Sequence, residues 1–232
     1  FMRLLLYLSL FPAAYSLKFL AFSTQFARAH ANYIARLSDV LVEAGHEVIP
    51  QCKQARVFDD FLDRVSANIW VMRHSVQMMQ ERRRVNAIWG HACLSVLDSP
   101  GLLDSLKLEH FDAAFSESAD VCGPVLFHLL GINKWAVTDS VAIQNNFDIT
   151  QTPSNPAYVP GMMANAGEQM SFVERLGNTL VATQFMIGTV YSDIEGVLRE
   201  RLPDLPPVPE ILASNSLVFL NSEPLVDFPR PS

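Results

Sequence analysis

Two residues of the sequence place a base and an acid where a parallel α/β fold could bring them together. His30 lies in LKFLAFSTQFARAHANYIARL, between an apolar run and a helical pattern, and Glu117 ends the segment FDAAFSE. A histidine whose far ring nitrogen contacts a carboxylate can act as a general base toward a hydroxyl group. Asp120, three residues after Glu117, is the alternative carboxylate. These residues predict a site for proton transfer.

Each of these residues could instead have a purely structural role. His30 could satisfy an exposed backbone group at the start of its helix, and Glu117 could cap the helix that follows it. Position alone favours this structural interpretation of His30, although Ile34, Leu37 and Leu41 share its helix face. At the first turn this face reaches the crevice beyond the strands, where open α/β sheets bind ligands. The helix N-terminus disfavours imidazolium, so a neutral imidazole could accept a proton near neutral pH.

The elements that position these side chains follow a β-α-β pattern. Residues 17–23 read as a buried strand, residues 29–44 as an amphipathic helix, and HEVIP as a second strand. Gly45 is predicted to end the helix in the left-handed conformation. Such a unit requires parallel strands joined by a right-handed crossover.

The same alternation continues to the end of the chain. A strand is predicted at 111–116, a helix that ends at Gly131, and a strand in NKWAVTD. A long loop covers 144–168, and a strand lies in SLVFLN. One long helix is predicted at 169–201, with core packing for Val173, Leu176, Leu180 and Val190. The fold class is therefore α/β, a Rossmann-like parallel sheet with helices on both faces.

Charge and cysteine spacing argue against nucleic-acid binding, a disulfide scaffold and a zinc site. The net charge is -7, and the only dense basic run is Arg82 to Arg84, so no nucleic-acid partner is expected. The three cysteines, Cys52, Cys93 and Cys122, are far apart and lack C-x-x-C spacing. We interpret them as buried free thiols rather than as a disulfide scaffold or a zinc site.

The first residues resemble a cleaved leader. A charged start at Met2-Arg3 precedes the apolar run LLLYLSLF, and Pro12 and small residues follow. We therefore expect a signal peptide at 1–16, a Rossmann-like domain at 17–220 and the start of a linker at 221–232. The run is shorter than the roughly 20 apolar residues that a membrane span needs.

Five segments in order resemble the N-terminal half of the animal UDP-glycosyltransferases, particularly the nematode members. The chain shares the strand-turn-helix around His30, followed by Gly45 of AGHEV fifteen residues on. The other segments that resemble the family are FDAAFSESADVCGPVLFHLLGI, NPAYVP, MSFVERLGNTL and FLNSEPLVDFPRP. The resemblance implies the N-terminal, acceptor-binding domain of a GT-B glycosyltransferase.

The resemblance also implies roles for residues. His30 would deprotonate the acceptor hydroxyl, with inversion at the sugar, and Glu117 would orient His30 at a place where the family more commonly has Asp. No metal or other cofactor is expected, since the UDP-sugar is a co-substrate held by the second domain. The acceptor would be a small lipophilic molecule, because Met and aromatic side chains suit such ligands. The same side chains would suit a hydrophobic core equally well. The predicted acceptor-binding residues are Phe26, Met78, Met79, Trp89, Phe147 and Tyr158.

Other features of the family have no counterpart in this sequence. We expect the UDP-binding segment and the C-terminal membrane helix of the family to lie outside these 232 residues. The resemblance places the full-length form in the lumen of the endoplasmic reticulum, anchored to the membrane, and allows homo- or hetero-oligomers with other transferases. We expect the acceptor half of a transferase, inactive without the donor domain. The alternative is a short, non-catalytic protein that binds lipophilic ligands or regulates full-length transferases.

Overall fold

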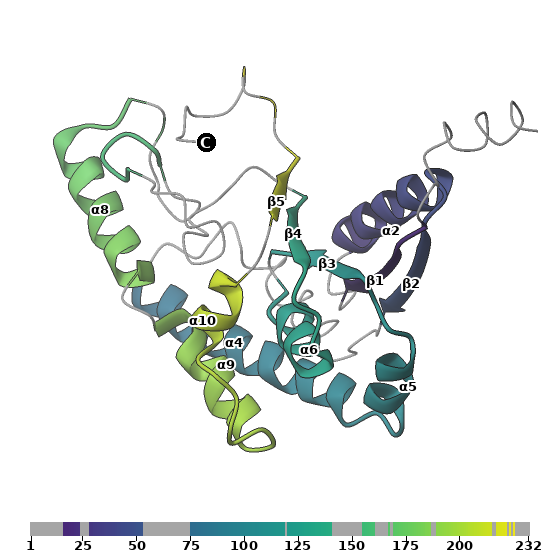
Figure 1. The fold of residues 1–232 in the computed structure, drawn as a ribbon. Coiled ribbons are helices and arrows are strands. Elements are labelled where there is room, and N and C mark those ends of the chain that lie inside the picture. The colour runs from purple at the N-terminus through teal and green to yellow at the C-terminus, as the bar shows by residue number, and fades with distance from the viewer. Residues whose placement is uncertain are drawn as a thin grey trace, which may run out of the picture.

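The computed structural model describes residues 16–23, 28–52, 75–118, 120–140, 155–160, 167, 169–186, 189–214, 217–221, 223 and 225. In this part of the chain, parallel strands form one sheet with the order β2-β1-β3-β4-β5 (Figure 1). The strands are β1 (Lys18–Ser23), β2 (Glu47–Cys52), β3 (Ala113–Glu117), β4 (Trp135–Asp139) and β5 (Leu217–Leu220). The helices are α2 (Arg28–Glu43), α4 (Ser75–Leu97), α5 (Leu102–Leu108), α6 (Cys122–Leu130), α8 (Phe172–Met186), α9 (Thr189–Arg199) and α10 (Val208–Ala213).

Helices cover both faces of the sheet. One core joins the sheet to α4, α6, α9 and α10, and Leu20 and Phe22 of β1 belong to it. A smaller core joins the opposite face to α2 and contains Ala21, Ile34 and Phe115. Parallel strands covered on both faces are apolar at successive positions, which explains the unbroken apolar run of β1. The predicted α/β, Rossmann-like fold class is confirmed.

Gly45 ends α2 as predicted. Its φ is 92°, a left-handed conformation that glycine adopts without steric cost. The Gly45 N–H donates to the carbonyl of Val42 at 2.9 Å, and the His46 N–H donates to that of Leu41 at 3.0 Å. These two bonds form a Schellman motif, which turns the chain directly into β2.

Two helices, α8 and α9, occupy the region where one long helix was predicted. The first begins at a capping box: the Ser171 N–H donates to Glu174 Oε2 at 2.7 Å, and the Glu174 N–H donates to Ser171 Oγ at 3.4 Å. The bond from the Ser171 backbone holds the pKa of Glu174 below its usual value. The S-x-x-E spacing therefore sets the helix start at Phe172 rather than at 169.

The prediction of core packing for Val173, Leu176 and Leu180 is wrong. Their exposed fractions are 74%, 50% and 59%. The buried face of α8 instead carries Asn178, which is 4% exposed. The side chain of Val190 lies outside the described residues.

Asn178 joins two segments that the sequence presents separately. Its Nδ2 donates to the carbonyl of Pro156 at 2.6 Å and to that of Val159 at 2.8 Å. A buried amide must find such partners, because an unpaired polar group in the interior is costly. The Asn of MSFVERLGNTL therefore holds the turn of NPAYVP against α8.

The interpretation of all cysteines as free thiols is also wrong. Cys93 of α4 and Cys122 of α6 form a disulfide, with their Cα atoms 5.2 Å apart. Their separation of 29 residues in sequence conceals this contact, since the packing of α4 against α6 brings the two thiols together. The side chain of Cys52 lies outside the described residues.

The short helix α10, which begins in the proline-rich segment PPVPE, was not predicted, and its Val208, Ile211 and Leu212 are buried in the larger core. Among the described helices, none is both long enough and apolar enough to cross a membrane.

Candidate functional site

The strand order places a topological switch point between β1 and β3. The chain leaves β1 through α2 and returns to the sheet at β2, whereas it leaves β3 through α6 and returns on the other side at β4. At such a reversal of the winding direction, open α/β sheets generally bind ligands beyond the carboxyl ends of the strands. His30, in the first turn of α2, and Glu117, the last residue of β3, lie at this switch point.

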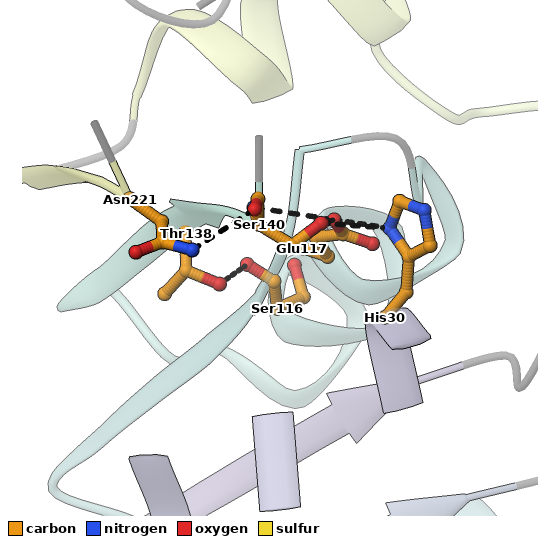
Figure 2. Close-up of polar contacts among 6 residues, drawn as sticks. All are labelled: His30, Ser116, Glu117, Thr138, Ser140 and Asn221. Carbon is orange, nitrogen blue, oxygen red and sulfur yellow. Dashed lines mark hydrogen bonds and ion pairs between the residues drawn. The ribbon is translucent and has the colours of Figure 1, made fainter. Parts of the chain in front are cut away.

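His30 and Glu117 contact each other directly. His30 Nδ1 bonds to Glu117 Oε1, while the second ring nitrogen points away from the carboxylate (Figure 2). The His30 side chain is 23% exposed, whereas that of Glu117 is 3% exposed. A buried carboxylate therefore faces one side of a ring that reaches toward the solvent. An imidazole that donates from Nδ1 presents a lone pair on Nε2, which is the arrangement of a general base.

Ser140, the residue after β4, is a third member of the cluster that the sequence analysis missed. Its hydroxyl donates to Glu117 Oε1, and its Oγ lies 3.0 Å from His30 Nδ1. The backbone N–H of Ser140 also donates to Glu117 Oε1, at 3.4 Å. A signal was present in the sequence, because a hydroxyl residue follows the last residue of a strand next to β3. Strand order was needed to recognise it.

Asp120, the alternative carboxylate, supports the next helix. Its Oδ1 accepts a hydrogen bond of 3.0 Å from the backbone N–H of Cys122, the first residue of α6. Asp120 is 2% exposed. The capping role that the sequence left open for Glu117 is thus taken by Asp120, and Glu117 is the carboxylate that contacts His30 Nδ1.

Tyr33 lies one turn of α2 beyond His30. Burial raises the pKa of its phenol above the ordinary 10.0, and the negative charges of Asp139 and Glu117 raise it further. The phenol therefore remains protonated near neutral pH and can donate a hydrogen bond. Two acidic groups at the carboxyl end of the sheet, Asp139 and Glu117, thus act on the protonated phenol.

The predicted acceptor-binding residues are only partly described. Trp89 packs against the larger core, and Tyr158 is 46% exposed in the turn at 155–160. The four other residues predicted for this role, Phe26, Met78, Met79 and Phe147, have side chains outside the described residues. Acceptor binding by this set stays a prediction. Among the described side chains, no three His, Cys, Asp or Glu residues are placed to hold a metal ion.

Comparisons with known proteins show to which family this chain is similar. Residues 35–232 match the family model described as UDP-glucoronosyl and UDP-glucosyl transferase. The protein ugt-47 of Caenorhabditis elegans, named as a UDP-glucuronosyltransferase, is 23% identical over 259 residues, which cover 99% of this chain and 48% of the relative. Human UDP-glucuronosyltransferase 1A1 is 24% identical over 197 residues, which cover 84% of this chain and 34% of the relative. The chain thus spans half or less of the length of these curated relatives.

Proposed function

The chain belongs to the UDP-glucuronosyl and UDP-glucosyl transferase family, and we propose that it forms the acceptor-binding half of an inverting GT-B transferase. The observation that carries this proposal is the contact between His30 Nδ1 and the buried carboxylate of Glu117 at the switch point of the sheet. The family supplies the reaction class, glycosyl transfer from a UDP-sugar. The pair supplies the group that would activate an acceptor.

In the proposed step, His30 Nε2 takes the proton of an acceptor hydroxyl. The oxygen attacks the anomeric carbon of the sugar as the bond from this carbon to the UDP oxygen breaks, and the configuration inverts. UDP leaves with the electron pair of that bond. Glu117 accepts a hydrogen bond from Nδ1, which holds the ring orientation and stabilises the imidazolium that forms.

The proposed division of labour assigns the acceptor to this chain and the UDP-sugar to a second domain joined through 221–232. The domain boundaries 17–220 and 221–232 belong to this proposal, as does a leader at 1–16. The full-length protein is proposed to lie in the endoplasmic reticulum, as the resemblance to the family implies, and its mammalian relatives include glucuronosyltransferases of human and rat. A small lipophilic molecule with a hydroxyl group is the proposed acceptor.

The test uses a fusion of this chain to the remaining half of ugt-47 through the segment at 221–232. We expect His30→Ala to lower kcat for a phenol acceptor about 10²- to 10⁴-fold, which is the usual contribution of a general base. Binding of UDP-sugar should not change. His128→Ala, which removes the exposed histidine of α6, is the matched control. Wild-type turnover by His30→Ala would exclude His30 as the base.

Calorimetric titration of the 232-residue chain tests the division of labour. We expect phenols to bind and titration with UDP to produce no heat of binding. Tight binding of UDP to this chain would contradict the assignment of the donor to a second domain. An active fusion in which phenols do not bind this half would place the acceptor elsewhere.

A further inference from the structure

We propose that Ser140 is a positioning residue that fixes the tautomer of His30. The proposal rests on the proposed function, in which Nε2 is the atom that takes the proton. It concerns a residue that neither the sequence analysis nor the family comparison assigns. Its basis is the pattern of donors and acceptors around a single carboxylate oxygen.

Glu117 Oε1 accepts hydrogen bonds on several sides. The His30 ring, the Ser140 hydroxyl and the Ser140 N–H all converge on this atom. By contrast, Glu117 Oε2 is buried and has no hydrogen-bond partner among the described residues. The orientation of the carboxylate therefore depends on its Oε1 side, where Ser140 supplies two of the donors.

The hydroxyl of Ser140 has only one hydrogen to give. A carboxylate accepts charge-assisted hydrogen bonds, which are stronger than neutral ones, so this hydrogen points to Glu117. The lone pairs of Ser140 Oγ are then left for other neighbours, and Oγ lies 3.0 Å from His30 Nδ1. Nδ1 thus faces two acceptors, Glu117 Oε1 and Ser140 Oγ (Figure 2).

A ring nitrogen that faces two acceptors must carry the proton. In the neutral imidazole, one nitrogen is a donor and the other an acceptor. The proton on Nδ1 therefore leaves Nε2 with the lone pair that the proposed reaction needs. Without Ser140, the carboxylate loses a partner that orients it, and the tautomer with the proton on Nε2 becomes more populated.

Asn221 holds Ser140 in place from the last strand. Its Nδ2 donates to the carbonyl of Ser140 at 3.1 Å, and its backbone N–H donates to the carbonyl of Asp139 at 3.0 Å. Figure 2 shows Asn221, Ser140, Glu117 and His30 in a row across the carboxyl ends of the strands. Ser140 is therefore tied to β5 through its backbone and to the candidate site through its side chain.

The test is ¹⁵N NMR of the histidine rings in the 232-residue chain, which reports the tautomer of each neutral imidazole. The chain has six histidines, and the His30 signals are assigned by their loss in His30→Gln. We expect wild-type His30 to carry its proton on Nδ1. In Ser140→Ala, the ratio of the Nδ1–H to the Nε2–H form should fall about 3- to 10-fold, the worth of one net hydrogen bond.

Two further variants separate positioning from general damage. Ser140→Thr keeps the hydroxyl and should restore the wild-type ratio. Ser38→Ala removes a hydroxyl on the same helix as His30 that donates to the Ile34 carbonyl, and it should leave the ratio unchanged. An unchanged ratio in Ser140→Ala, or an Nε2–H form in the wild type, would overturn the proposal.

A fourth variant applies if Ser140→Ala does not fold. Ser140→Cys replaces the hydroxyl by a weaker donor of similar shape, so its tautomer ratio should lie below that of Ser140→Thr. Equal ratios in these two variants would overturn the role of the hydroxyl. A ratio that responds to Ser140, combined with full turnover by His30→Ala in the fusion, would uphold Ser140 as a positioning residue and reject His30 as the base.

Discussion

Reduction of the disulfide between Cys93 and Cys122 should destabilise the chain strongly. The perturbation is made in a Cys52→Ala background, where these are the only two cysteines left. The bond closes a loop of 29 residues. For a loop of this length, the chain-entropy relation predicts a loss of about 3.6 kcal/mol at 25 °C, because the reduced unfolded chain regains conformational freedom. Folded domains are stable by only about 5–15 kcal/mol, so this loss is a large share.

The assay is urea unfolding with and without reductant, followed by the intrinsic fluorescence of the tryptophans. We expect the midpoint to fall by more than about 1 M on reduction. In the Cys93→Ala/Cys122→Ala variant, reductant should have no effect, which makes this variant the matched control. A thiol count supplies a separate check, with no reactive thiol before reduction. Identical midpoints with and without reductant, or two free thiols in the oxidised protein, would refute the assigned bond and its energetic role.

Four smaller changes test other parts of the structure. The folded state retains the phenol proton of Tyr33 above pH 10.0, where the unfolded chain loses it, so the free energy of unfolding should fall as the pH rises through this range. In thermal melting at a series of pH values, Tyr33→Phe should lose less stability over this range than the wild type does. Asp120→Ala should lower the free energy of unfolding by about 1–3 kcal/mol, since it removes the acceptor of the buried Cys122 N–H at the start of α6. Glu117→Gln should lower kcat of the fusion with little change in KM, and a larger loss in Asp120→Ala would assign the orienting role to Asp120. Ser171→Ala should increase amide exchange in the first turn of α8 about fivefold, with unchanged exchange in α9 as the internal control.

Local patterns in the sequence are sufficient for the elements nearest to the site. The apolar run before His30, the helical spacing of Ile34, Leu37 and Leu41, and Gly45 predict the β-α-β unit that the structure contains. The choice of Glu117 as the carboxylate near His30 follows from its place at the end of a parallel strand. In each case the signal lies within a few residues of the feature that it predicts.

Features that depend on distant contacts were missed. Ser140 joins the site because β4 is the neighbour of β3, and the order of strands is not encoded in the periodicity of either. The disulfide depends on how α4 crosses α6, and the apolar residues of α8 gave no indication that Asn178 would be the buried side chain. These features are consequences of packing, which overrides the tendency of each local segment.

The candidate site joins positions that are remote along the chain. His30 lies 87 residues from Glu117 and 110 residues from Ser140, so neither contact can form within a single hairpin or helix. Their meeting requires β1, β3 and β4 to be aligned side by side, and such long-range pairing is slow relative to local structure. During refolding, the helical circular dichroism signal should therefore recover before the wild-type state of the His30 ring does. The tautomer of His30 would then report the alignment of β1, β3 and β4, and it would distinguish molecules with these three strands in place from partly folded ones in any preparation of this chain.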